Sequence, residues 1–188
     1  MYASHVRRLW LSITFPLALG CRPPNIPAQP KPQEYAVYTA WLEQESSSSP
    51  HQLSFAVDSA TLPLQQNELQ FRQCLPRRME AIFDSAPAAD LTASSSNDWI
   101  TLSDGRPTRL HPHGTGMSFD HPTQLFRVSR VAFTRFGYDA YLWVERWTCG
   151  TGDDLACKAG SGALVHGRKS NGSWSFEDTN CQIIVLGH

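Results

Sequence analysis

The sequence predicts an α+β domain in which N-terminal helices pack on a curved antiparallel β-meander of four to six strands. Two observations support this fold class. Residues 33–45 and 67–85 carry apolar and aromatic side chains at helical spacing, whereas residues 125–187 hold short runs of alternating apolar residues separated by turn-forming Gly, Asn and Asp. Helices followed by a series of strands are typical of the α+β class.

The helical region begins after a proline-rich segment. In EYAVYTAWLEQE, aromatic and apolar residues recur at helical spacing, and Pro32 stands in the first turn, where proline is tolerated. We therefore expect a helix over residues 33–45, which the following serine run ends. We also expect a short strand at residues 53–57, and one or two amphipathic helices over residues 67–85 that are interrupted near Pro76.

The strand region follows a long segment with little regular pattern. Residues 85–122 are rich in Ser, Asp, Gly, Pro and His, and we expect a loop there, with regular structure only near residues 99–102. Beyond this loop, Asn171-Gly172 is the strongest turn signal. The expected strands are LFRVSRVAF, YDAYLWVERW, SGALVHGRK, GSWSF and CQIIVLG.

The first twenty residues have the architecture of a signal peptide. Two arginines precede an apolar stretch, residues 9–20, that is too short to span a bilayer. The stretch ends in LALGC, residues 17–21, which resembles the lipobox of bacterial lipoproteins. The resemblance implies cleavage after Gly20 and acylation of Cys21; the alternative is an ordinary secretory signal with a chance cysteine. Arg22, where an aspartate would favour the inner membrane, points to the outer membrane.

The mature chain is expected to consist of a tether and one domain. Residues 22–32 read RPPNIPAQPKP, and five prolines in eleven residues favour an extended conformation. The expected organisation is a signal peptide at residues 1–20, a lipid-anchored proline-rich tether at residues 21–32 and a single domain at residues 33–188. Several buried acyl chains would make the membrane anchor durable.

The charge balance gives no support to nucleic-acid binding. Removing residues 1–20 takes two arginines from the 16 basic residues and leaves 14 against 17 acidic residues, a net charge of −3. The sequence contains no phosphate-binding loop, no dinucleotide-binding glycine motif and no Gly-x-Ser-x-Gly nucleophile elbow. We expect no cofactor.

The cysteines predict two disulfides. If Cys21 is acylated, four cysteines remain in an oxidising compartment. A bridge between Cys149 and Cys157 closes a loop of about nine residues and would contribute about 2.5 kcal/mol. It leaves Cys74 and Cys181 to tie the helical half to the last strand. A zinc site built from the same thiols needs short paired spacings, which are absent around Cys74 and Cys181.

One histidine-rich segment could bind a metal ion. His111, His113, Asp120 and His121 place three imidazoles and a carboxylate within eleven residues. Nothing in the intervening glycine-rich stretch fixes their geometry, and such a segment is more often a solvated loop. A metal-dependent hydrolase that uses this loop is the alternative to a binding protein.

The strand expected at residues 138–147 is apolar on both faces. Its alternate residues form an aliphatic face, and Tyr141, Trp143 and Trp147 form an aromatic one. A central strand that is covered on both sides is the favoured interpretation, because large exposed apolar patches are rare. An aromatic groove for a ligand or partner is the alternative. We expect Trp143 to be core and Trp147, nearer the strand end, to be the more exposed.

Blocks near the two ends of the mature chain carry a family resemblance: EYAVYTAWL, residues 129–133 (SRVAF), residues 140–145 (AYLWVE), Cys149-Gly150, Cys157, residues 160–162 (GSG) and residues 171–174 (NGSW). Together they resemble a family of uncharacterised bacterial exported proteins. The resemblance implies a shared fold but brings no catalytic residue or ligand with it. The chain departs from the family pattern in its longer GTGDDLA segment between two cysteines and in lacking a second Cys-Gly.

The expected function follows from the anchor and from the missing catalytic motifs. We expect a cell-envelope lipoprotein at the outer membrane that serves as a non-enzymatic binding or interaction module. Its expected partners are the membrane, through the lipid anchor, and an envelope protein or a small ligand.

Overall fold

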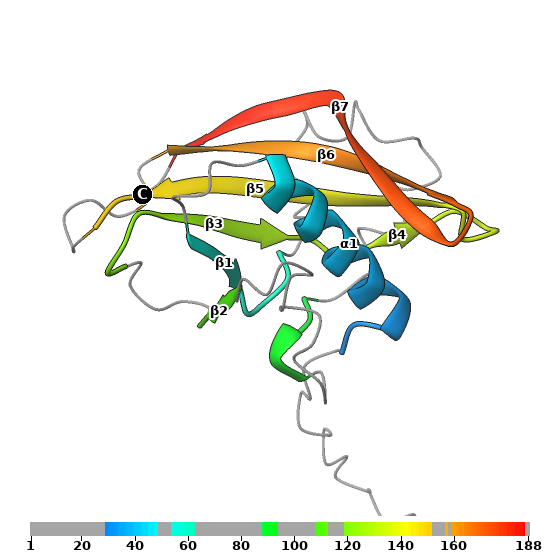
Figure 1. Ribbon diagram of the computed structural model, residues 1–188, viewed down its shortest axis with the longest axis horizontal. Coiled ribbons are helices and arrows are strands. Elements are labelled where there is room, and N and C mark those ends of the chain that lie inside the picture. The colour runs from blue at the N-terminus through cyan, green and yellow to red at the C-terminus, as the bar shows by residue number, and fades with distance from the viewer. Residues whose placement is uncertain are drawn as a thin grey trace, which may run out of the picture.

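The structure is a computed structural model that describes residues 29–48, 54–62, 88–93, 108–112, 119–151, 157 and 159–186. In this part of the chain, a single α-helix lies across one face of a seven-stranded mixed sheet (Figure 1). None of its helices is long and apolar enough to cross a membrane. The elements are α1 (Pro32–Ser48), β1 (Ser54–Asp58), the 3-10 helix η1 (Leu91–Ala93), β2 (Arg109–His111), β3 (Thr123–Val128), β4 (Ala132–Phe133), β5 (Asp139–Cys149), β6 (Ala159–Ser170) and β7 (Ser173–Leu186).

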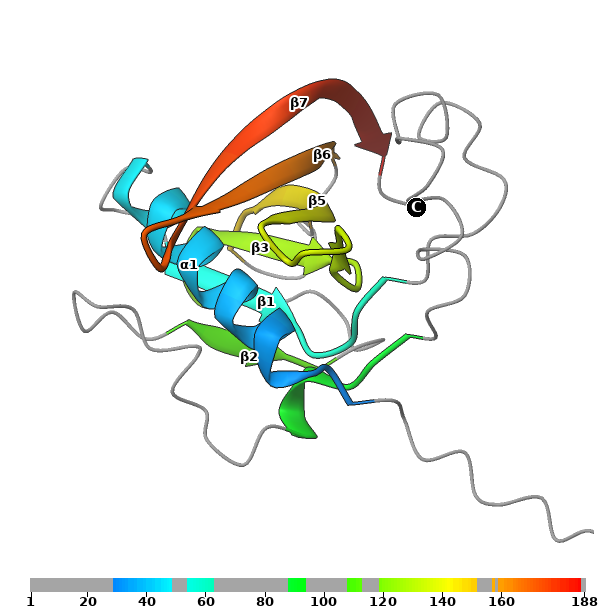
Figure 2. The same cartoon turned by 90° about the vertical axis from the view of Figure 1, so that its right-hand side faces the viewer.

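The sheet combines parallel and antiparallel pairing. Six strands follow the order β2-β1-β3-β5-β6-β7 across the sheet. The short seventh strand, β4, pairs, among the described strands, only with β5. β1 is parallel to both β2 and β3, whereas the remaining pairs are antiparallel. Two views at right angles show β6 and β7 curling away from the other strands (Figure 1 and Figure 2).

The predicted fold class was wrong. Instead of several helices on an antiparallel meander, the described residues form one α-helix on a mixed sheet of seven strands. A short apolar run such as residues 53–57 alternates in the same way in parallel and antiparallel pairs, so contacts far along the chain decide the pairing. β2 lies within the expected loop, and the helices expected at residues 67–85 lie outside the described residues.

The helix begins with a capping arrangement that the sequence encodes. Glu34 accepts a hydrogen bond from the Lys31 backbone N–H at 2.8 Å, and Pro32 occupies the first helical position. Arg130 donates two hydrogen bonds to the same carboxylate, at 2.8 and 2.7 Å, although Glu34 is only 2 % exposed. This buried ion pair fixes the start of α1 against the connection between β3 and β4. The helix expected over residues 33–45 is confirmed.

The main hydrophobic core lies between α1 and the sheet. Trp41 of the helix meets Phe126 of β3 edge-to-face, with ring centroids 5.1 Å apart. The aliphatic face of β5 points into this core, as its alternation predicted. Its buried side chains include Val37, Tyr38, Trp41, Leu42, Phe55, Val57, Leu91, Phe126, Val128, Leu142, Val144 and Phe176.

On the opposite face of β5, tryptophans lie over glycines of β6. Trp143 and Trp147 are 1 % and 3 % exposed. A Cβ atom on Gly162 would collide with the Trp143 indole, and one on Gly160 would come within 2.9 Å of Trp147 Cδ2. Glycine therefore leaves the room on β6 that the indoles of β5 fill, and β5 is buried on both faces.

The last two expected strands form one long strand. β7 runs unbroken from Ser173 to Leu186, and its pairing with β6 shifts register between Ala163 and Val165. This irregularity falls between the expected strands GSWSF and CQIIVLG and accounts for the break in alternation there. The expected turn is confirmed, because Asn171 and Gly172 have φ angles of 51° and 85°, as a two-residue hairpin of this type requires.

Candidate functional site

One end of the sheet carries an open pocket. We name this the turn end; it comprises the β4–β5 turn (residues 134–138), the β6–β7 turn (residues 171–172) and the first turn of α1, all of which contribute residues to the pocket. The pocket has a volume of about 380 Å³, within the range of small-ligand sites. Four aromatic side chains, one cation and two amides line it: Phe133, Phe136, Tyr138, Trp174, Lys169, Gln33 and Asn171.

Hydrogen bonds hold the β4–β5 turn in one shape. The Gly137 N–H donates to the Thr134 carbonyl at 2.9 Å, and the Thr134 N–H donates to the Asp139 carbonyl at 3.0 Å. Gly137 has a φ of +69°, which residues with a side chain rarely adopt. The Lys169 N–H donates to the Tyr138 carbonyl at 2.7 Å and joins this turn to β6. The turn therefore presents its aromatic side chains from a fixed backbone.

Two aromatic side chains of the turn end are strongly exposed. Phe136 is 77 % exposed and Tyr138 is 64 % exposed. In the described part of the chain, the other large hydrophobic side chain with such exposure is Ile184, at 80 %, which lies eleven residues along β7 from the start of that strand. Single exposed hydrophobic residues are common, but two of them beside one pocket indicate an interaction surface.

Cations accompany the aromatic rings of the pocket. The Lys169 ammonium lies 5.8 Å from the ring centroid of the partly buried Trp174, and the Arg135 guanidinium lies 5.9 Å from the Phe136 ring. Phe133 and Trp174 have ring centroids 6.3 Å apart. Such a lining suits a ligand that combines an apolar part with an anionic group.

The turn end has an excess of positive charge. Arg135 and Lys169 are exposed there, and the exposed Arg168 lies on the opposite face of β6 from Lys169. The neighbouring carboxylate of Asp139 is partly buried, 3.7 Å from Arg168 Nε and 3.0 Å from His166 Nε2. Glu177, whose side chain is 74 % exposed, adds a second carboxylate beside His166, so the cations next to the pocket itself are Lys169 and Arg135.

His166, outside the pocket, is held between two carboxylates. Its Nε2 atom lies 3.0 Å from Asp139 Oδ1 and its Nδ1 atom 3.2 Å from Glu177 Oε1. The Tyr141 ring stacks on the imidazole at 4.7 Å, and burial, followed by the charge of Asp139, raises the pKa of Tyr141. Because both imidazole nitrogens are engaged, His166 cannot ligate a metal ion or accept a proton from a substrate without losing a contact.

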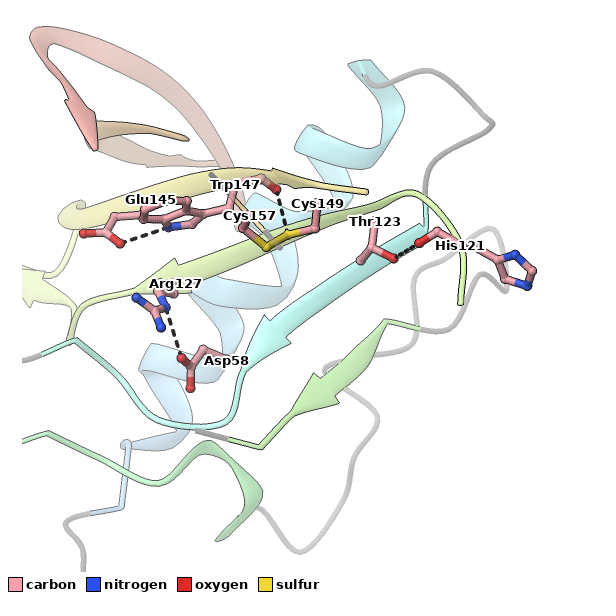
Figure 3. The surroundings of a disulfide bond; sticks show 8 residues. All are labelled: Asp58, His121, Thr123, Arg127, Glu145, Trp147, Cys149 and Cys157. Carbon is pink, nitrogen blue, oxygen red and sulfur yellow. Dashed lines mark hydrogen bonds and ion pairs between the residues drawn. A yellow bond between two sulfur atoms is a disulfide. The ribbon is translucent and has the colours of Figure 1, made fainter. Parts of the chain in front are cut away.

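The predicted disulfide between Cys149 and Cys157 is confirmed. The two Cα atoms are 4.3 Å apart, and Figure 3 shows the bridge beside Trp147. Cys181 is also disulfide-bonded. Cys74, its predicted partner, lies outside the described residues, as does the predicted lipidation site Cys21.

A polar cluster next to the disulfide joins β1, β3 and β5 (Figure 3). The Trp147 indole N–H donates to Glu145 Oε2 at 3.1 Å, and the Arg127 guanidinium lies 5.9 Å from the Trp147 ring. Arg127 Nε is 3.3 Å from Oδ2 of the buried Asp58, at ion-pair distance but without hydrogen-bond geometry. The side chains of Asp58, Arg127, Glu145 and Trp147 therefore contact one another and connect β1, β3 and β5.

The histidine-rich segment does not form a metal site within the described residues. The His111 ring on β2 lies 5.2 Å from the ring of Phe119. Asp120 and His121 are exposed, and the His121 side chain points away from the disulfide (Figure 3). His113 lies outside the described residues. In the part of the chain that the structure describes, no three His, Cys, Asp or Glu side chains could share a metal ion.

The two tryptophans of β5, Trp143 and Trp147, are buried in the core and do not line an exposed groove. Trp143 is buried, as expected. Trp147 is hardly more exposed than Trp143, so the expectation of an exposed indole there was wrong. Its burial follows from Gly160 on β6, the disulfide and Leu125, which surround it. Tyr141, the third candidate, is partly exposed and stacks on His166.

A second pocket, of about 450 Å³, offers less specific chemistry. It lies between the end of β1 and η1 and is lined by small side chains and backbone. Its carboxylate, Asp90, already accepts hydrogen bonds from the Thr92 N–H at 2.8 Å and from the Thr92 hydroxyl at 2.7 Å. The turn end is therefore the stronger candidate site.

Sequence reasoning missed the turn end. Phe136 and Tyr138 stand in the segment RFGYD, and the sequence places Trp174 only in the expected strand GSWSF. The available signal was two aromatic residues on either side of a turn glycine, where polar residues are the rule.

No protein-family model matches the chain, and searches of curated proteins and of solved structures found no similar protein. The function is therefore inferred from the residues and the geometry described above.

Proposed function

We propose that the chain is a cell-envelope lipoprotein, anchored to the outer membrane through acylated Cys21, that binds another envelope component at the turn end without catalysing a reaction. Residues 1–20 serve as the signal peptide and residues 21–32 as the tether of a single domain. The observation that carries the binding role is the open pocket flanked by exposed Phe136 and Tyr138.

The turn end has the properties of a preformed binding surface. Its exposed rings stand on a turn that is closed by backbone hydrogen bonds, so little conformational entropy is lost on binding. Aromatic side chains contribute strongly to interfaces because each buries a large area in few rotamers. Lys169 and Arg135 add a preference for partners that carry negative charge.

The described residues give less support to the metal-dependent hydrolase. His111 and His121 lie on different segments and face different surroundings. His166 is fully engaged by Asp139 and Glu177. A binding role needs none of these groups to act as a ligand, acid or base.

Photocrosslinking in intact cells tests the proposed binding surface. The photoreactive analogue p-benzoylphenylalanine replaces Phe136 in one variant and Ile184 in a matched control, since both side chains are exposed and hydrophobic but Phe136 lies in the β4–β5 turn and Ile184 on β7. Illumination should produce a defined adduct with an envelope component from position 136 and none from position 184. Equal adducts from both positions, or none from position 136, would contradict the proposal.

A further inference from the structure

We propose that the component bound at the turn end is the membrane surface itself, with Phe136 and Tyr138 entering the interfacial region and the neighbouring cations contacting anionic lipid headgroups. The inference rests on the proposed anchoring through Cys21, which would bring the domain to a membrane. It goes further by fixing which end of the domain faces that membrane.

The position of α1 places the turn end close to the anchor. Gln33 and Ala36, in the first turns of the helix, line the pocket, so the chain enters the domain at this end. Ten residues separate Cys21 from Pro32, and the eleven steps between the two Cα atoms can span at most about 40 Å. The first residue of the domain therefore stays within that distance of the acylated cysteine. The end of β7 lies at the opposite end of the molecule (Figure 1).

The exposed side chains of the turn end match the chemistry of a membrane interface. Aromatic rings with a polar end favour the headgroup level, and apolar side chains favour the adjoining acyl region. Tyr138 is of the first kind and Phe136 of the second, and they stand on either side of Gly137 at the tip of one turn. The pocket beside them has Lys169 and Trp174 in its wall and is large enough to admit a headgroup.

The charge of the turn end favours an anionic surface. Arg135 and Lys169 are exposed there, and basic residues near an anionic membrane each strengthen binding. Asp139, the neighbouring carboxylate, is two-thirds covered and paired with His166 and Arg168. A tethered domain needs only weak affinity for this contact, because the anchor raises its local concentration at the membrane.

Vesicle flotation of the unacylated chain tests the surface separately from the anchor. The exported Cys21→Ser protein should float with vesicles of phosphatidylethanolamine and phosphatidylglycerol at low salt, and poorly with phosphatidylcholine alone. Partitioning should fall at least about tenfold in Phe136→Ser/Tyr138→Ser and about fivefold in Lys169→Gln. Ile184→Ser should bind like the parent, and added salt should weaken the binding. Circular dichroism melts establish that each variant is folded.

Three results would overturn the inference: no flotation of the Cys21→Ser protein with the anionic vesicles, equal binding to phosphatidylcholine, or a folded Phe136→Ser/Tyr138→Ser variant that binds like the parent. A crosslink from position 136 to a protein in cells, combined with any of these results, would refute the membrane as occupant while leaving the proposed binding role in place. If Cys21 proved not to be acylated in cells, the flotation result would still hold, because the protein assayed carries no acyl chain.

Discussion

The contact between Trp143 and Gly162 predicts a stability effect that depends on both residues. A methyl group added by Gly162→Ala would collide with the Trp143 indole, which is 1 % exposed and cannot move into solvent. Overpacking of a filled core by one methyl group costs about 1 to 3 kcal/mol. Trp143→Ala removes the indole and should cost about 3 to 5 kcal/mol through the cavity it leaves.

The double variant separates this contact from a general effect of glycine replacement. In a Trp143→Ala background the added methyl group faces the cavity and still lies 3.1 Å from Cγ1 of Ile183, a partly exposed side chain that can shift by a few tenths of an ångström. Gly→Ala within a strand then gains about 0.5 to 1 kcal/mol from reduced backbone entropy. The two substitutions should therefore couple by about 2 kcal/mol. That is a large share of the 5 to 15 kcal/mol that stabilises a typical domain.

Urea unfolding of the unacylated Cys21→Ser chain, followed by circular dichroism, measures the four free energies of this cycle. Gly160→Ala with Trp147→Ala serves as the control, because a Cβ atom on Gly160 also comes within 2.6 Å of the Arg146 carbonyl oxygen, which removing an indole does not relieve. Gly160→Ala should therefore still lower the free energy of unfolding by most of its original amount in the Trp147→Ala background. Additive effects at Gly162 and Trp143, or an unchanged stability of Trp143→Ala, would refute the packing described here.

Three further predictions concern the covalent and polar contacts. Cys149→Ser should lower the free energy of unfolding by about 2.5 kcal/mol, and peptide mapping without reductant should recover Cys149 linked to Cys157; recovery of two free thiols would refute the bridge. Glu34→Gln should cost about 3 to 5 kcal/mol in urea unfolding, because it leaves the Arg130 charge unpaired in a site that is only 14 % exposed; a loss below about 1 kcal/mol would contradict this. Burial raises the pKa of Tyr38 well above its usual value of 10, so the neutral phenol stabilises the fold fully below pH 10 and that stability is lost as the pH rises further. Tyr38→Phe should flatten the fall in unfolding free energy above pH 10, and an unchanged slope would argue against it.

Local elements of the fold could be predicted because their signals are local. The aromatic spacing and Pro32 predicted α1, and Asn171-Gly172 predicted the β6–β7 turn, since both depend on residues that are neighbours in sequence. The parallel pairing of β1 depends instead on β3, which starts more than sixty residues later. Alternation in a short strand carries no information on the direction of its partner.

The disulfide and the functional site illustrate the same limit. The pairing of Cys149 with Cys157 was predictable because the two thiols lie eight residues apart. The burial of Trp147 was not, because it depends on Gly160 across the strand pair and on Leu125 of β3. The pocket joins three segments, among them Gln33 at one end of the domain sequence and Trp174 near the other, and no pattern along the chain places them together.

Metabolic labelling with palmitate is the measurement that tests the proposed lipoprotein most directly. The parent chain and a Cys149→Ser control should both incorporate label, because neither changes the residues around the predicted cleavage site. Cys21→Ser should be exported without label, since acyl transfer requires the thiol at that position. Label that persists on Cys21→Ser, or a parent chain that is exported without label, would contradict the assignment.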